Sequence, residues 1–251
     1  MITKLSDWHS PSPSSEQSDE PVLRAITQLR AGKAIIVQDA EDRENEADLV
    51  ALADRVSPDV VNFMITHGRG LVCAPVSREI AERLRLDPMV KGNSDPHRTQ
   101  FTVSVDAASC RTGISATERA RTLRALADLH ATAGDFTRPG HVFPLIAHPA
   151  GVLGRAGHTE AATDLARLAD APAAGVICEI LGQDGNPITG RSVARFAARF
   201  GLLRLTIQQL IRYRAAHDSA LLGRDLMPDL TNANPLISYS RYMEKALASC
   251  I

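Results

Sequence analysis

The sequence predicts an α+β fold: a single domain in which a mixed β-sheet is flanked by helices. From about residue 20 to residue 217, short apolar runs typical of buried strands are interspersed with segments of helical period. Two strand-like runs, 34–37 and 48–53, follow one another around an acidic segment, so the order is not a regular strand–helix alternation. This order favours a mixed sheet over a doubly wound parallel one. A chain of 251 residues fits one large domain or two small ones, and the lack of a linker-like segment favours one.

The composition is that of an ordinary globular protein, with 44% hydrophobic and 23% charged residues. A formal net charge of -1 without a basic block argues against binding to nucleic acid or to an anionic membrane. No apolar run is long enough to span a bilayer, and the N-terminus lacks the apolar core of a signal peptide. The four cysteines lie far apart and form no CxxC pair. A cytoplasmic protein is therefore expected.

The first structured elements are expected to be a helix and two strands. Residues 1–19 are rich in serine, proline and charge, which is typical of a flexible arm. From Glu20 to Gly32 apolar residues recur at helical spacing, and the glycine ends the helix. The run AIIV (34–37) and the run DLVALA (48–53), on either side of the acidic segment, each read as a strand.

Capping residues mark two later helices. Ser57, followed by Pro58 at the first helical position, starts a helix that is expected to stop at Gly68. Ser115 and Glu118 form a capping box at the start of another. Amphipathic spacing predicts the remaining helices, at 77–86, 158–169, 191–201 and 207–217. Apolar or alternating runs predict strands at 71–76, 101–105, 141–147, 174–180 and 203–206. Residues 218–251, interrupted by proline and asparagine, are expected to form a C-terminal tail.

The acidic segment QDAEDRENEADLV places six carboxylates around a single arginine, Arg43, directly after a strand. Oxygen-rich loops of this kind suit hard divalent cations such as Mg²⁺ or Mn²⁺. It is not an EF-hand, because the sixth position counted from Asp39 is Glu44 and the twelfth is Val50. A solvated acidic turn explains the composition equally well.

Three further segments place ionisable groups beside apolar runs. In TRPGHVFPL, His141 is either a structural histidine or a functional one. In GRAGHTEAATDL, Arg155 precedes a helix start whose free N–H groups favour an anion such as phosphate. His158 in the same turn could ligate a metal ion. The alternative is a capped helix start without a ligand. In GVICEI, Glu179 follows a buried run, so its carboxylate needs a partner or a raised pKa and is a candidate general acid or base.

Seven motifs occur in an order that closely resembles the 3,4-dihydroxy-2-butanone 4-phosphate synthases, enzymes of riboflavin biosynthesis. They are DAEDRENEADLV, HGRGLVCAPV, FTVSVDA, RTGISATERARTLRAL, RPGHVFPL, RAGHTEAATDLARLA and AGVICEIL. The resemblance covers roughly residues 20–217. It implies the family's α+β fold, a homodimer with the active site near the subunit interface, and a lyase that converts D-ribulose 5-phosphate to L-3,4-dihydroxybutan-2-one 4-phosphate and formate. It also implies Mg²⁺ or Mn²⁺, with two ions in each active site.

The resemblance implies roles for individual residues. Glu44 and His158 match the metal ligands. His141 and Glu179 match the two positions essential for catalysis, Asp48 matches a substrate contact that could also move protons, and Cys73 matches a cysteine that lines the site. The residues that match substrate contacts are Arg43, Glu44, Asp48, Thr112, Arg155, Ala156, Gly157, His158, Thr159 and Glu179.

Three departures from the family pattern leave alternatives open. Arg111 replaces the first threonine of a Thr-Thr-Gly-Ile-Ser motif, Glu118 stands where aspartate is usual, and Gln100 stands where a small residue is common. They motivate the alternatives of a paralogue acting on a related sugar phosphate and of a non-catalytic family member. The cysteine-rich zinc motif of GTP cyclohydrolase II is absent from the tail, so the bifunctional fusion is not expected.

Overall fold

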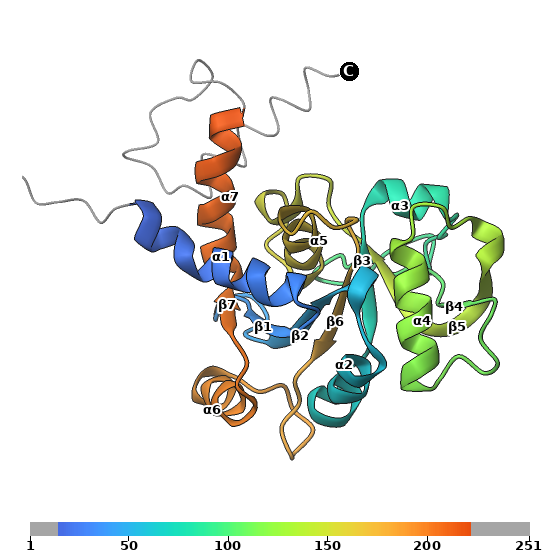
Figure 1. Cartoon of the computed structure of the whole chain (residues 1–251), viewed down its shortest axis with the longest axis horizontal. Helices are drawn as coiled ribbons and strands as arrows, with labels where there is room; N and C mark the ends of the chain where they lie inside the picture. Colours follow the sequence, from blue (N-terminus) through green and yellow to red (C-terminus); the bar gives the residue numbers. More distant parts are fainter. Residues whose placement is uncertain (1–14, 222–251) are drawn as a thin grey trace, which may run out of the picture.

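A seven-stranded mixed sheet lies between two layers of helices in the computed structural model (Figure 1). The structure describes residues 15–221, with side chains described from 19 to 218. The strand order is β4-β5-β3-β6-β2-β1-β7. The predicted α+β fold, a single mixed sheet flanked by helices, is confirmed.

Strand β2 lies near the middle of the sheet and pairs antiparallel with both β1 and β6. The strands are β1 (Ile35–Gln38), β2 (Ala47–Leu52), β3 (Cys73–Val76), β4 (Val105–Ala107), β5 (Phe136–Ile146), β6 (Gly175–Glu179) and β7 (Arg204–Thr206). The pairs β1–β7 and β3–β5 are parallel. All six residues of β2 are buried, because alternate side chains such as Leu49 and Val50 enter the apolar cores on opposite faces.

The two faces of the sheet carry different sets of helices. One core is closed by α1 (Ser15–Arg30), α5 (His158–Leu168) and α7 (Ile207–Leu221). The other is closed by α2 (Pro58–Phe63), α3 (Arg78–Arg83), α4 (Ala116–Ala127) and α6 (Gly190–Phe200). Figure 1 shows α1 and α7 lying together at the β7 edge. Among the helices of the described residues, none is long and apolar enough to cross a membrane.

The terminal helices are longer than predicted. Helix α1 begins at Ser15, so it extends into the segment expected to be a flexible arm, and α7 continues to Leu221 beyond the expected end at residue 217. The other residues of the predicted arm and tail, 1–14 and 222–251, lie outside the described residues.

The predicted strand 101–105 is shifted along the chain. Phe101 and Thr102 make only isolated bridges, and the ordered strand β4 starts at Val105. The N–H of Thr102 donates to the carbonyl of Pro144 at 3.0 Å, and Pro144 has no N–H with which to continue the ladder. Strand β5 starts at Phe136, five residues earlier than predicted, because its first residues pair with β4.

The predicted helix stop at Gly68 has a different basis. Gly68 ends a π-helical turn, Met64–Gly68, and the left-handed residue that follows is Arg69, with φ of 71°. A side chain at Gly68 would meet Leu49 Cδ1 at 3.1 Å and Cys178 Sγ at 3.2 Å. Glycine therefore lets the turn pack closely against β2 and β6, where a side chain would force its neighbours to shift.

Because Leu49 is fully buried in the central strand, Leu49→Ala is expected to lower the free energy of unfolding by about 2 to 5 kcal/mol. Leu23→Ala, at a leucine that is 50% exposed on α1, is the control and is expected to change it by less than about 1 kcal/mol. Urea unfolding of both variants measures the difference. Equal losses would contradict the placement of β2 at the centre of the core.

Candidate functional site

A cavity of about 210 Å³ opens where the turn between β1 and β2 meets the start of α5. Its floor is formed by the ends of the central strands. The lining residues are Arg43, Glu44, Glu46, Asp48, Cys73, Thr99, Phe101, Leu145, Arg155, His158, Thr159, Ile177 and Glu179. Eight of the residues named from the sequence therefore meet at one place, although they are spread over more than 130 positions of the chain.

Sheet register places the two carboxylates of the floor. Asp48 in β2 is the direct antiparallel partner of Glu179 at the end of β6. The carboxylate of Glu179 accepts the backbone N–H of Leu71 at 2.8 Å. This close approach depends on Gly70, because any side chain there would collide with Glu179. Gly70 thus makes room for the carboxylate of Glu179.

The acidic turn is organised by Asp39, a residue not predicted as part of the site. Its buried carboxylate accepts the backbone N–H of Glu46 at 2.8 Å and that of Glu44 at 3.2 Å. It also accepts a bond from Arg43 Nη1 at 2.9 Å. Arg43 lies 2.8 Å from Glu44 as well. The single arginine therefore links two of the carboxylates around it, and the turn is an ordered structure rather than a solvated one.

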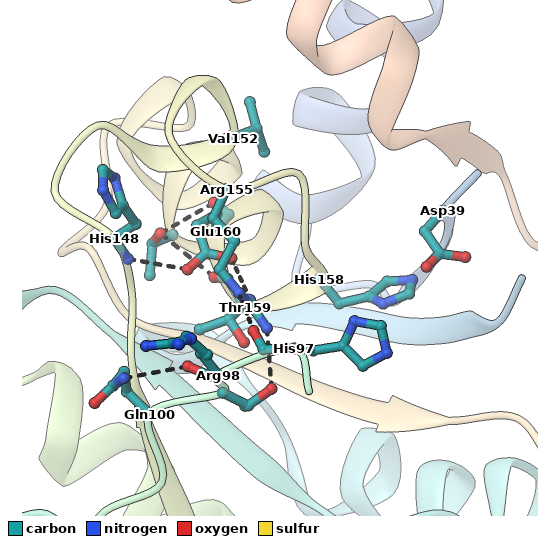
Figure 2. Close-up of polar contacts among 12 residues, drawn as sticks. Asp39, His97, Arg98, Gln100, His148, Val152, Arg155, His158, Thr159 and Glu160 are labelled. Atoms are coloured by element: carbon teal, nitrogen blue, oxygen red, sulfur yellow. Dashed lines mark hydrogen bonds and ion pairs between the residues drawn. The ribbon is translucent and has the colours of Figure 1, made fainter. Parts of the chain in front are cut away.

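Glu44 and His158 converge, as the resemblance implied. Each offers a ligand atom within 4.8 Å of the other and of one on Asp39. Figure 2 shows the ring of His158 directed from the start of α5 toward Asp39. His158 Nε2 is buried and has no hydrogen-bond partner among the described residues. Burial lowers the pKa of His158, which favours the neutral imidazole that metal ions require.

The electrostatics of the cavity also favour a cation. Burial raises the pKa of Asp48 well above its usual range, and the neighbouring Glu179, Glu46, Glu44 and Asp39 raise it further. The pKa of Glu46 is raised for the same reasons. One oxygen of Asp48, Oδ1, is buried without a partner. A divalent ion would neutralise this mutual repulsion and satisfy the orphaned atoms, so the residues present fit a metal site.

The start of α5 forms the wall beside the metal site. Gly157 is the N-cap and His158 the first helical residue, so the helix begins with no capping side chain. Thr159 and Arg155 line the cavity, while Ala156 and Gly157 form the turn between them. Free N–H groups and the helix dipole at such an end favour an anion.

Cys73 lies in the floor next to Glu179. Burial, followed by the charges of Glu179 and Asp48, raises the pKa of the thiol well above its usual range. A thiol held neutral in this way supports a lining role and argues against a thiolate nucleophile.

Four predicted site residues do not line this cavity. Ala156 and Gly157 belong to the turn before α5, whereas His141 and Thr112 belong to a separate cluster. His141 Nδ1 is 2.7 Å from Asp106 Oδ2, and its backbone N–H donates to Asp106 Oδ1 at 2.9 Å. The side chain of His141 is 43% exposed. Gly113 packs directly on Asp106, which brings the loop that carries Thr112 beside this pair. A second cluster with an oriented, accessible imidazole therefore lies apart from the metal site.

The three departures from the family pattern lie outside the cavity. The side chain of Gln100 is exposed and donates to the carbonyl of Arg98 at 3.2 Å. Glu118 accepts bonds from the N–H groups of Arg111, Thr112 and Gly113. These bonds, the one from Arg111 first, lower the pKa of Glu118 to about 2. None of the three observations favours a different substrate.

Sequence reasoning missed several residues of the two clusters: Asp39, Glu46, Thr99, Phe101, Asp106, Leu145 and Ile177. The acidic stretch itself pointed to Asp39 and Glu46, but spacing could not separate the ligands from the organising residue. Thr99 and Asp106 carry no signal in the sequence, because their partners lie 56 and 35 positions away.

Comparison with known proteins agrees with this geometry. The family model described as 3,4-dihydroxy-2-butanone 4-phosphate synthase matches residues 23–213. The riboflavin biosynthesis protein RibBA of Bacillus mycoides (strain KBAB4) is 53% identical over 198 residues, which is 79% of this chain and 50% of the relative. The chain thus spans about half the length of the curated relatives that it matches.

Two solved structures are similar over most of the described fold. RibBX, a two-domain 3,4-dihydroxy-2-butanone 4-phosphate synthase from A. baumannii, aligns with a TM-score of 0.76 at 48% identity, covering 78% of this chain and 58% of that one. A 3,4-dihydroxy-2-butanone 4-phosphate synthase in complex with two magnesium ions aligns with a TM-score of 0.75 at 40% identity, covering 78% and 97%. On the extent of the family match and these identities, the chain belongs to the 3,4-dihydroxy-2-butanone 4-phosphate synthase family.

Proposed function

We propose that the protein is a lyase of riboflavin biosynthesis that converts D-ribulose 5-phosphate to L-3,4-dihydroxybutan-2-one 4-phosphate and formate. Family membership supports this activity, and the convergence of Glu44 and His158 beside paired carboxylates is the structural observation that carries it. The five carbons of the substrate are divided between the four-carbon product and formate. One water molecule is lost after enolisation and one is added when formate is released, so the reaction balances. A small sugar phosphate is the expected partner, and the cytoplasm is the proposed location.

Mg²⁺ or Mn²⁺ is the proposed cofactor, with two ions in each site. Glu44 and His158 would hold metal, and Asp39 is a third candidate ligand. The similar structure that contains two magnesium ions supports this number. When bound, such ions polarise a ketone and its neighbouring hydroxyl and stabilise the negative charge that develops on their oxygens.

Asp48 and Glu179 are the proposed acid–base pair. Burial, followed by the charge of Glu179, raises the pKa of Asp48 well above its usual range, so Asp48 holds a proton more readily than in water. One carboxyl group can then donate a proton while the other accepts one, which enolisation and loss of water both require.

The start of α5 is the proposed phosphate site. Arg155 supplies positive charge, and the turn from Ala156 to Thr159 supplies backbone N–H groups at the positive end of the helix. Arg43, between its carboxylates, is placed to orient the sugar hydroxyls. Fixing the phosphate in the same cavity as the metal ligands would convert binding energy into correct placement of the reacting carbons.

A homodimer is proposed because one protomer leaves His141 and Thr112 outside its own cavity. Asp106 fixes the tautomer of His141 and leaves Nε2 for proton transfer. If a second copy places this cluster over the cavity, His141 and Thr112 act in the site of the other protomer. This arrangement agrees with an active site near the subunit interface.

The protein is expected to release formate from D-ribulose 5-phosphate only when Mg²⁺ or Mn²⁺ is present. Glu44→Ala and His158→Ala are each expected to reduce the rate by at least about a thousandfold, because either change removes a proposed ligand. An assay coupled to formate dehydrogenase measures the formate that is released. A folded, metal-loaded protein that released no formate would contradict the proposed reaction.

Metal affinity tests the ligands without reference to catalysis. His158→Ala is expected to weaken Mn²⁺ binding by about a hundredfold or more. Glu41→Gln, an exposed carboxylate in the same turn, is the control and should bind Mn²⁺ nearly as the unmodified protein does. Titration calorimetry in the absence of sugar phosphate gives both affinities. Equal affinities in the two variants would exclude His158 as a ligand.

Mixed dimers test whether the site is shared. The Glu44→Ala and His141→Ala variants are each expected to be inactive alone. When their subunits are mixed and reassort at random, half of the dimers contain one subunit of each variant, and each mixed dimer has one intact site. The mixture should therefore regain about one quarter of full activity. Formate release before and after reassortment is the measurement. No recovery, with reassortment verified by native mass spectrometry, would show that His141 does not act across the dimer.

A further inference from the structure

The guanidinium group of Arg155 is engaged by three acceptors of the protein itself (Figure 2). Nη1 donates to Glu160 Oε2 at 2.6 Å, Nη2 to Thr99 Oγ1 at 2.9 Å, and Nε to the carbonyl of His97 at 3.1 Å. Two of the five N–H bonds of an arginine remain, one on each terminal nitrogen. Arg155 is therefore held in place before any ligand arrives and can still bind one.

Glu160 is the rigid end of this arrangement. It is 1% exposed in the first turn of α5, and its other oxygen, Oε1, accepts the backbone N–H of His148 at 2.9 Å. Gly157 makes room for the ion pair, because a side chain there would meet Arg155 Nη1 and would approach Glu160 Oε2 to 2.9 Å. A buried carboxylate that is bonded to backbone on one side and to a guanidinium on the other is fixed in orientation.

The loop 93–100 depends on this arginine for its position. Most of its hydrogen bonds are internal, such as those from Thr99 N–H to Asp95 at 2.7 Å and from the Asn93 side chain to the Thr99 carbonyl at 2.9 Å. At its end, the carbonyl of Gln100 accepts the N–H of Ile146 in β5 at 3.0 Å. Within the part of the chain that the structure describes, the hydrogen bonds of Arg155 tie residues 97–99 to the turn before α5. The loop forms part of the cavity wall through Thr99, and His97 Nδ1 lies 3.6 Å from Glu44 Oε1.

We propose that Glu160 is a positioning residue that acts through Arg155 to hold loop 93–100 against the cavity. The negative charge of Glu160 selects the orientation of the guanidinium that reaches both His97 and Thr99. Since the same guanidinium keeps free N–H groups, the position of the loop and the contact to an anionic substrate are coupled. The coupling to substrate relies on the proposed function, whereas the effect on the loop does not.

Glu160→Gln removes the charge and one acceptor with little change of shape. The amide has one oxygen, so it cannot accept from both His148 N–H and Arg155. In protein without metal or substrate, backbone amides of 93–101 are expected to exchange hydrogen for deuterium about tenfold faster, as loss of a charge-assisted hydrogen bond implies. Mass spectrometry of peptides from this segment measures the rate.

Asp164→Asn is the matched control. Asp164 lies one turn further along α5, is fully buried, and pairs with Arg214 and Arg167 instead of Arg155. It should destabilise the protein to a similar degree while leaving exchange in 93–101 unchanged. If the loop exchanged faster in this control as well, the effect of Glu160→Gln would reflect a general loss of stability, and the proposal would be overturned.

A double variant separates positioning from a direct effect. In an Arg155→Ala background, Glu160→Gln is expected to cause no further increase in loop exchange, because its action passes through the arginine. An additional increase of the same size in this background would overturn the proposal, as would unchanged exchange in Glu160→Gln alone. If formate is released, Glu160→Gln should raise KM about tenfold with a smaller change in kcat and leave Mn²⁺ affinity unaltered.

Discussion

The structure depends on a concentration of negative charge around one buried, neutral imidazole. Burial and the neighbouring carboxylates raise the pKa of Asp48 and of Glu46, and His158 presents a nitrogen that no described residue satisfies. Without a cation such a cluster destabilises the fold, since buried like charges repel strongly. The arrangement of these side chains therefore favours a bound cation, in agreement with the family structure that contains magnesium ions.

The fold produces this cluster by bringing three chain segments to one end of the sheet. The antiparallel pairing of β2 with β1 sets the acidic turn directly at the sheet end, and its pairing with β6 sets Asp48 against Glu179. The first residue of helix α5, His158, lies beside this turn, close to Asp39 and Glu44. Buried carboxylates later in the same helix, Glu160 and Asp164, accept backbone N–H groups of His148 and Val152 and so tie the helix to the preceding loop.

Much of the fold follows from local sequence, and less of the site does. Continuous apolar runs predicted β2 and β6 because both are covered on two faces, and Ser57 and Ser115 cap helices as expected. The start of α1 was misplaced because serine and charge resemble a flexible arm. The meeting of Glu44 with His158, 114 positions apart, came from resemblance and not from spacing. The His141–Asp106 pair and the contacts of Arg155 are long-range, so they required the three-dimensional structure.

The most direct test of this account is the position of a bound ion. Crystals grown with Mn²⁺ and measured on both sides of the manganese absorption edge would locate it by anomalous scattering. The account predicts a peak within coordination distance of His158 Nε2 and a Glu44 carboxylate oxygen. A peak elsewhere on the protein, with the imidazole of His158 bonded to a protein group instead, would contradict it.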